Sequence, residues 1–229
     1  MSRFVSLPMA DGAVVPAWVA RPEGEPRGAI VVLQEIFGVN AHIRAVADGL
    51  AEQGYLSVAP ALFERVEPGV DLGYEQADRV RGMALKNAAE ALPGLGVQQE
   101  IRAALDHASA LAPGVGLGLM GFCWGGLLAW RAACTMPGVA AAVCYYGGGM
   151  TRPEEAQRSP QCPVMAHFGR HDDHIPLAGV EAFARAQQQV QLHLYDAGHG
   201  FHCDARGSYD AASARLAQER SLAFFEKNL

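Results

Sequence analysis

Residue types suited to nucleophilic catalysis occur at three points of the sequence, each directly after an apolar segment. Cys123 lies within Gly-Phe-Cys-Trp-Gly-Gly (121–126), which has the spacing of a nucleophile elbow, G-x-S-x-G, with cysteine in place of serine. Asp172 and Asp173 follow a later apolar segment, and His199 follows the next one. A nucleophilic thiol needs a base to take its proton, and the base needs an acid to fix its tautomer. The sequence therefore predicts a triad of cysteine, aspartate and histidine.

The glycines around Cys123 are what a sharp strand-to-helix turn requires, because larger side chains would not fit within such a turn. The turn would place the thiol at a helix N-terminus, where the helix dipole favours the thiolate. The backbone N–H of Trp124 could then donate to an oxyanion. The alternative is a buried structural cysteine in a glycine-rich turn.

Glu35 is a second unusual feature. It directly follows the apolar segment 29–33, where burying a carboxylate is costly without a partner. The residues alone leave two alternatives: a side chain that reaches solvent or pairs with an arginine, or a functional carboxylate.

Metal binding is the main competing hypothesis. One cluster of ligand-type side chains spans 171–174 (His-Asp-Asp-His), and another contains His199, His202 and Cys203. Their spacing fits no standard zinc pattern, and the predicted triad already uses two of these residues. We therefore expect no metal.

Two further motifs carry less weight. Gly116, Gly118 and Gly121 match G-x-G-x-x-G, but inside an expected strand and without the acidic residue that a ribose contact requires about 20 positions later. The sequence contains no C-x-x-C pair that would indicate redox chemistry. We therefore predict no organic cofactor, and a non-catalytic protein of the same fold stays a third alternative.

Apolar periodicity predicts the elements that must position these residues. The expected strands are 4–8, 14–20, 29–33, 55–59, 115–120, 139–145, 164–168 and 191–195, and the expected helices are 40–53, 97–111, 127–136, 180–189 and 208–228. Asp11-Gly12 indicates a hairpin between the first two strands, and residues 60–80 have an irregular pattern. Strand–helix alternation favours an α/β fold with a mostly parallel sheet and helices on both faces, with its active site at the carboxyl ends of the strands.

Length and composition limit the protein classes. The chain has 229 residues, of which 50% are hydrophobic and 18% charged, and this predicts one globular domain over 1–229. The net charge of −6 argues against nucleic acid or an anionic membrane as partner. We find neither a membrane-spanning run nor a secretory signal, and five cysteines without close pairing indicate reduced thiols. We expect a cytoplasmic protein.

The chain resembles the dienelactone hydrolase family, the carboxymethylenebutenolidases, over essentially its full length. The matching segments are 34–40, 42–44, 121–126, 169–172 with Pro176, and 198–201 with Arg206 and Tyr209. The resemblance implies an α/β-hydrolase fold with an N-terminal hairpin. It also implies an enzyme that opens an enol-lactone ring through an acyl-enzyme, with no metal or organic cofactor.

The resemblance implies roles for individual residues. Cys123, His199 and Asp172 would form the triad, and Asp172 is preferred to Asp173 because it keeps the family's spacing to neighbouring motif residues. Glu35 would lie near the resting thiol and keep it unreactive until substrate binds.

Further roles follow from the same resemblance. The backbone N–H groups of Ile36 and Trp124 would hold the oxyanion. Phe37 and Tyr145, together with Trp124 and Phe201, would line an apolar pocket.

Family substrates carry a carboxylate, which arginine side chains can bind. Arg81 and Arg206 are the candidates, with Arg79 as an alternative to Arg81. Cys203 stands where the best-known family pattern has an arginine, four residues after the histidine, so the carboxylate contact is expected to be moved or lost. The expected partner is a small lactone or ester from aromatic-compound degradation, and the expected state is a monomer or small homo-oligomer. The alternative activity is a broader carboxylesterase or thioesterase.

Overall fold

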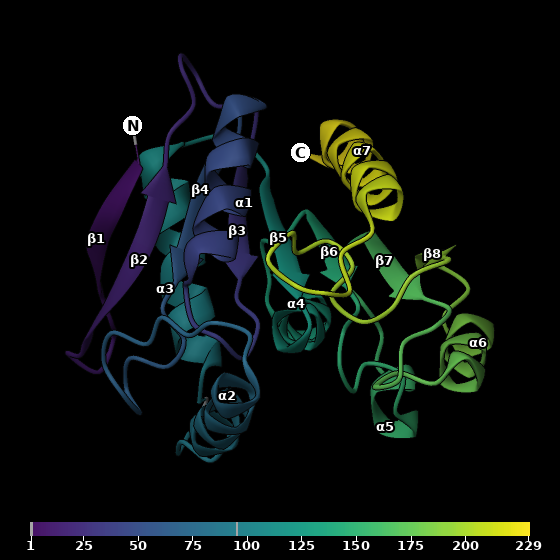
Figure 1. Cartoon of the computed structure of the whole chain (residues 1–229). Helices are drawn as coiled ribbons and strands as arrows, with labels where there is room; N and C mark the ends of the chain where they lie inside the picture. The colour runs from purple at the N-terminus through teal and green to yellow at the C-terminus, as the bar shows by residue number, and fades with distance from the viewer. Residues whose placement is uncertain (1, 95) are drawn as a thin grey trace. The chain divides into compact units, whose positions relative to one another are not determined.

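The computed structural model describes residues 2–94 and 96–229, which fall into two compact units, Met1–Leu117 and Gly118–Leu229 (Figure 1). Each unit contains its own strands and helices. No helix among the described residues is long and apolar enough to cross a membrane. The organisation of 1–229 as a single domain stays a prediction.

The first unit begins with the predicted hairpin. β1 (Ser2–Pro8) and β2 (Val14–Ala20) pair antiparallel across the Asp11-Gly12 turn. β4 (Leu56–Pro60) pairs antiparallel with β2 and parallel with β3 (Ala29–Leu33), giving the order β1-β2-β4-β3. β3 and β4 are buried at every position, as their unbroken apolar sequences predict.

Two of the three helices in this unit were expected. α1 (Ala41–Glu52) begins after Asn40, whose side chain accepts the Ile43 N–H at 3.3 Å, so the predicted cap is confirmed. α3 (Gln98–Leu111) buries a face of regularly spaced apolar residues. Both helices contact β3 and β4, and this packing buries the two strands.

α2 (Gln76–Glu90) was not expected: residues 61–75 are irregular as predicted, but the helix begins inside the segment 60–80 and continues to Glu90. It begins with a capping box in which Glu75 and Asp78 satisfy each other's backbone N–H groups. Only Gly82, Leu85 and Ala89 are buried along it, so its apolar stripe is too narrow to dominate the sequence pattern.

The second unit is a parallel sheet in the order β5-β6-β7-β8. Its strands are β5 (Leu117–Phe122), β6 (Ala141–Tyr145), β7 (Val164–Gly169) and β8 (Gln191–Tyr195). Its helices are α4 (Trp124–Thr135), α5 (Pro153–Ala156), α6 (Leu177–Ala186) and α7 (Ala211–Asn228). α4 and α7 both pack on β6, which is buried along its whole length.

The register of this sheet aligns the strand ends. Phe122 pairs with Tyr145, and Tyr145 pairs with His167. Gly169, at the end of β7, pairs with Tyr195, at the end of β8. The segments that follow these strands therefore leave from one edge of the sheet, where active sites of parallel sheets lie.

Several observed boundaries differ from the sequence prediction. β5 continues two residues beyond the expected end at 120, and α4 starts at Trp124 rather than 127, so only Cys123 separates them. α6 begins three residues earlier than expected, directly after Pro176. Short α5 was not predicted, because four residues are too few to show helical periodicity.

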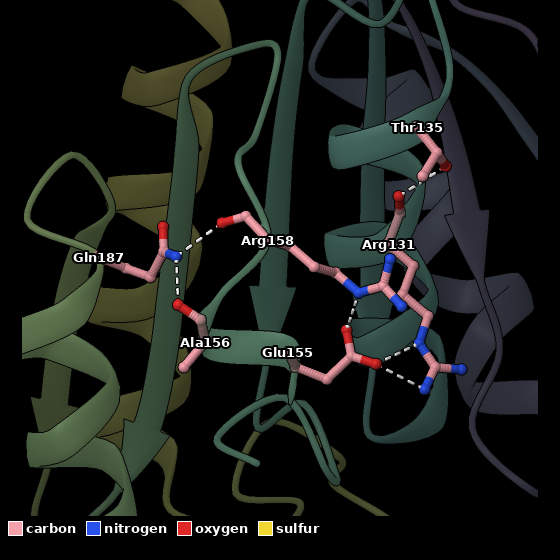
Figure 2. A network of polar contacts seen from close by, with 6 residues as sticks. All are labelled: Arg131, Thr135, Glu155, Ala156, Arg158 and Gln187. Atoms are coloured by element: carbon pink, nitrogen blue, oxygen red, sulfur yellow. Dashed lines mark hydrogen bonds and ion pairs between the residues drawn. The ribbon is translucent and has the colours of Figure 1, made fainter. Parts of the chain in front are cut away.

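A buried carboxylate fixes the segment that contains α5 (Figure 2). Glu155 is 1% exposed, and its Oε1 accepts hydrogen bonds from the Arg131 guanidinium at 2.7 and 2.8 Å. Its Oε2 accepts Arg158 Nε at 2.7 Å. Gln187 Nε2 donates to the backbone carbonyls of Ala156 and Arg158, both at 2.7 Å. This network holds the segment between β6 and β7 against α4 and the end of α6.

Candidate active site

Cys123 occupies a sharp turn between β5 and α4. Its backbone has φ 53° and ψ −113°, a left-handed conformation that costs energy for any residue with a Cβ. Its N–H donates to the Tyr145 carbonyl at 3.0 Å, which helps to hold the turn in place. A Cβ at Gly121 would lie 2.0 Å from the Gly125 oxygen, and one at Gly126 would lie 2.8 Å from the Tyr145 oxygen. The predicted elbow is confirmed, and its glycines are sterically required.

The loop after β6 passes directly beside the elbow. The Cys123 carbonyl accepts N–H groups from Gly126 at 3.0 Å and from Gly148 at 3.1 Å. A Cβ at Gly148 would lie 3.9 Å from the Cys123 sulfur. The half-buried thiol is therefore bordered by this loop.

Asp172 follows β7 and has a fully buried side chain. Its Oδ1 accepts backbone N–H groups from His174 at 2.8 Å and Ile175 at 3.0 Å. Its Oδ2 accepts Nδ1 of His199 at 2.8 Å. Asp173 is exposed. The structure therefore pairs Asp172, and not Asp173, with the histidine.

His199 follows β8 and connects the acid with the thiol. It hydrogen-bonds both Asp172 and Cys123, and its side chain is 8% exposed. Burial would lower its pKa, but the negative charge of Cys123 and the bond to Asp172 raise the pKa to about 10. The Ser208 hydroxyl donates to the His199 carbonyl at 2.6 Å and fixes this part of the loop.

Two aromatic rings contact His199: Tyr146, which the sequence did not single out, and His174, which it indicated only as a metal-ligand candidate. Tyr146 approaches edge-on at 5.1 Å between ring centroids, and its own φ is 36°. His174 approaches at 5.0 Å with an interplanar angle of 84°. Each follows a strand at the same sheet edge, so the rule that identified the triad could have found them.

The geometry can be compared with known proteins. The sequence profile of the Dienelactone hydrolase family matches residues 15–229. The chain belongs to this family.

Relatives agree with the family match. The carboxymethylenebutenolidase of Pseudomonas putida is 36% identical over 232 residues, covering 98% of this chain and 96% of that protein. A Klebsiella pneumoniae structure described as a candidate dienelactone hydrolase is 29% identical, with a TM-score of 0.83 and 98% of each chain covered. The chain is thus a hydrolase of the dienelactone hydrolase family.

The α/β-hydrolase fold is confirmed as well. A lidless α/β serine hydrolase from Xanthomonas campestris has a TM-score of 0.69, with 99% of this chain and 94% of that chain covered. Its sequence is 18% identical, so this likeness concerns the fold alone.

Three residues that the family resemblance implicates in the site lie in the first unit. Glu35, Ile36 and Phe37 follow β3 and are 1%, 8% and 3% exposed. The Phe37 ring packs edge-on against Tyr74 at 4.7 Å. The preceding Gln34 accepts the Leu62 N–H at 3.0 Å and thereby anchors this segment.

The candidate arginines have different settings. Arg81 lies on α2, is 56% exposed and forms an ion pair with Glu67. Arg79 is exposed on the same helix. Arg206 is half-buried, and its guanidinium lies where a Cβ on Gly200 would collide with it, at 2.4 Å. Cys203, at the position of the family arginine, is fully buried.

Tyr145 does not lie where the pocket prediction places it. Its ring is fully buried and stacks on Phe122 with centroids 4.7 Å apart. Its hydroxyl is 2.7 Å from Ser221 Oγ, inside the sheet–α7 packing. A side chain on that face has no surface to offer a substrate, whereas Tyr146 contacts His199. Phe201 is also fully buried.

A second serine–histidine contact occurs in this packing. His167 Nε2 lies 3.0 Å from Ser221 Oγ, and its Nδ1 lies 2.8 Å from the Tyr195 hydroxyl. His167 and Ser221 are both fully buried, and burial lowers the pKa of His167. The pair connects β7, β8 and α7. Because neither residue reaches solvent, it is not a candidate site.

The clusters weighed as metal ligands do not converge. Among the described residues of the second unit, no three His, Cys, Asp or Glu side chains bring ligand atoms together. Asp172 is bound to His199, and His171 is bound to Asp196 instead.

Proposed function

We propose that this hydrolase cleaves esters or lactones with Cys123 as nucleophile, His199 as base and acid, and Asp172 as the residue that orients His199. The observation that carries the proposal is the continuous hydrogen-bonded series from Asp172 through His199 to Cys123, together with the strained backbone at Cys123. A non-glycine residue held in such a conformation between a strand and a helix is typical of an exposed nucleophile.

The proposed reaction has two stages. The Cys123 thiolate attacks the carbonyl carbon, the C–O bond to the leaving group breaks, and His199 gives its proton to the leaving oxygen. Water then attacks the thioester carbon and transfers a proton to His199, and the C–S bond breaks as the carboxylic acid product forms. The thiolate and the imidazolium are restored as the C–S bond breaks, and the released acid then loses its proton to solvent.

Two backbone groups complete the proposal. The N–H of Trp124, the first residue of α4, is proposed to donate to the oxyanion, because the dipole of α4 favours negative charge at its N-terminus. Family membership supports the N–H of Ile36 as the second donor and the Glu35 carboxylate as the group that keeps the resting thiol unreactive.

The proposed substrate is a carboxylated enol-lactone, by analogy with the carboxymethylenebutenolidase of Pseudomonas putida. Arg81 and Arg206 are the proposed carboxylate partners, with Arg79 as an alternative, and Phe37 a proposed wall of the site. The second candidate activity is a broader carboxylesterase or thioesterase, which Cys203 at the family arginine position favours. We further propose a cytoplasmic protein acting on small molecules in aromatic-compound degradation, as a monomer or small homo-oligomer.

The test is turnover of cis- and trans-dienelactone beside p-nitrophenyl acetate by wild-type protein and Cys123→Ala. We expect the variant to lose hydrolysis of every substrate while its circular dichroism spectrum and melting temperature stay close to wild type. Cys162→Ala, which removes another half-buried thiol outside the elbow, is the matched control and should retain activity. Retained turnover in Cys123→Ala would remove the nucleophile assignment.

A further inference from the structure

His174 contacts His199 of the proposed triad and is itself exposed to solvent. Its ring lies edge-to-face against His199, with centroids 5.0 Å apart, yet its side chain is exposed. His199 itself is only 8% exposed. An imidazole is thus placed where the buried triad meets the space from which a substrate arrives.

The position of His174 is fixed by the triad. Its backbone N–H donates to Asp172 Oδ1 at 2.8 Å, and the other carboxylate oxygen accepts His199. A shift of the His174 backbone relative to His199 would therefore disturb the acid. A residue tied in this way can recognise a substrate group at a defined distance from the reacting carbonyl.

The charges around His174 favour an anionic group. The Asp172 carboxylate is fully engaged by three N–H groups, and the raised pKa of His199 keeps that ring positive beside the negative charge of Cys123. Asp196 is engaged by His171, and the other exposed acids of these two loops are Asp173 and Asp204. An imidazole offers an N–H donor whether neutral or protonated.

The loop after β6 adds a cation near the thiol. Arg152 is exposed, and its Nε lies 3.5 Å from the Cβ position of Gly149. The neighbouring Gly148 is the residue that borders the Cys123 sulfur. Among the described residues, no acidic side chain forms an ion pair with Arg152.

We propose that His174 is a specificity-determining residue that donates a hydrogen bond to an anionic group, such as a carboxylate, on the substrate. The inference rests on the proposed function, because it concerns the substrate of the proposed triad. It states which chemical group of that substrate lies beside His199. It predicts a preference for anionic acyl groups that is independent of Arg81 and Arg206.

The test uses two esters that share a leaving group and differ in charge: p-nitrophenyl pentanoate and the p-nitrophenyl monoester of glutaric acid. For the anionic ester, His174→Leu and His174→Phe should lower kcat/KM about tenfold, mainly through KM, as expected for the loss of one hydrogen bond to a charged group. For the neutral ester, kcat/KM should change by less than about twofold, because that ester has no carboxylate for His174 to bind.

His171→Gln is the matched control, because it removes the same side-chain type from the same loop without touching His199. It should change neither ester. The proposal would be overturned if the His174 variants lost kcat/KM equally on both esters or on neither. It would also be overturned if only Arg152→Gln showed a selective loss on the anionic ester. Failure of the proposed function would give a different result: Cys123→Ala would then hydrolyse the esters at the wild-type rate.

Discussion

Asp172 and His199 are joined by a 2.8 Å hydrogen bond from Nδ1 to Oδ2, and both backbone N–H groups on Oδ1 come from the loop that Asp172 itself begins. The acid is thereby held rigidly by its own loop, and the histidine is held by the acid. These hydrogen bonds distinguish Asp172 from Asp173, two adjacent residues of the same type.

Asp172→Asn should lower kcat for p-nitrophenyl acetate by a factor on the order of 10² to 10⁴, because an amide favours the wrong histidine tautomer. The exposed neighbour supplies the control: Asp173→Asn should leave kcat within about twofold of wild type, as expected for a side chain outside the hydrogen-bonded series. Steady-state kinetics on both variants checks the prediction, and equal losses would show that the loop shares the role between the two carboxylates.

His199 makes stability depend on pH. Burial opposes its charge, but Cys123 and Asp172 raise its folded-state pKa from 6.5 to about 10. A raised folded-state pKa stabilises the protein fully below pH 6.5, and this contribution is lost as the pH rises toward 10. The free energy of unfolding in urea should therefore fall between pH 7 and pH 10. In Cys123→Ala, which lacks the main group that raises this pKa, the fall should begin at lower pH. Coincident pH profiles for the two proteins would refute this account.

The elbow should not tolerate a methyl group at Gly121. Its Cβ would lie 2.0 Å from the Gly125 oxygen, so Gly121→Ala should destabilise the fold by about 3 kcal/mol through backbone displacement. Gly49→Ala is the control, because nothing lies within 4 Å of a Cβ there and the residue is inside α1. That change should stabilise the protein by about 1 kcal/mol, since alanine favours helix. Chemical denaturation of both variants measures the two opposite effects.

Glu155 should contribute strongly to stability although it lies outside the triad (Figure 2). Glu155→Ala leaves the partly exposed Arg131 and Arg158 without their shared carboxylate, so we expect a loss of about 2–3 kcal/mol. The exposed pair of Arg215 and Glu219 on α7 is the comparison, and Arg215→Ala should cost about 0.5 kcal/mol or less. A similar loss in both variants would show that burial of the carboxylate is not what matters.

Much of the fold could be predicted because its elements are dictated locally. The hairpin around Asp11-Gly12, the cap at Asn40 and the all-apolar β3 each depend on neighbours in the chain, and each is confirmed. α2 could not be predicted, because its narrow buried face is set by packing: a Cβ on Gly82 would lie 2.2 Å from the Ile36 oxygen.

The sharp strand-to-helix turn at Cys123 and the chain order of Cys123, Asp172 and His199 could be read from the sequence, since glycine spacing and the apolar segments are properties of the chain. Which of two neighbouring side chains faces His199 depends on packing and hydrogen bonds that the sequence does not show. Tyr145 turns its hydroxyl to Ser221 while Tyr146 meets His199, and Asp172 turns inward while Asp173 stays exposed. Packing against α7 holds Tyr145 inside, and hydrogen bonds from His174, Ile175 and His199 hold Asp172 inward.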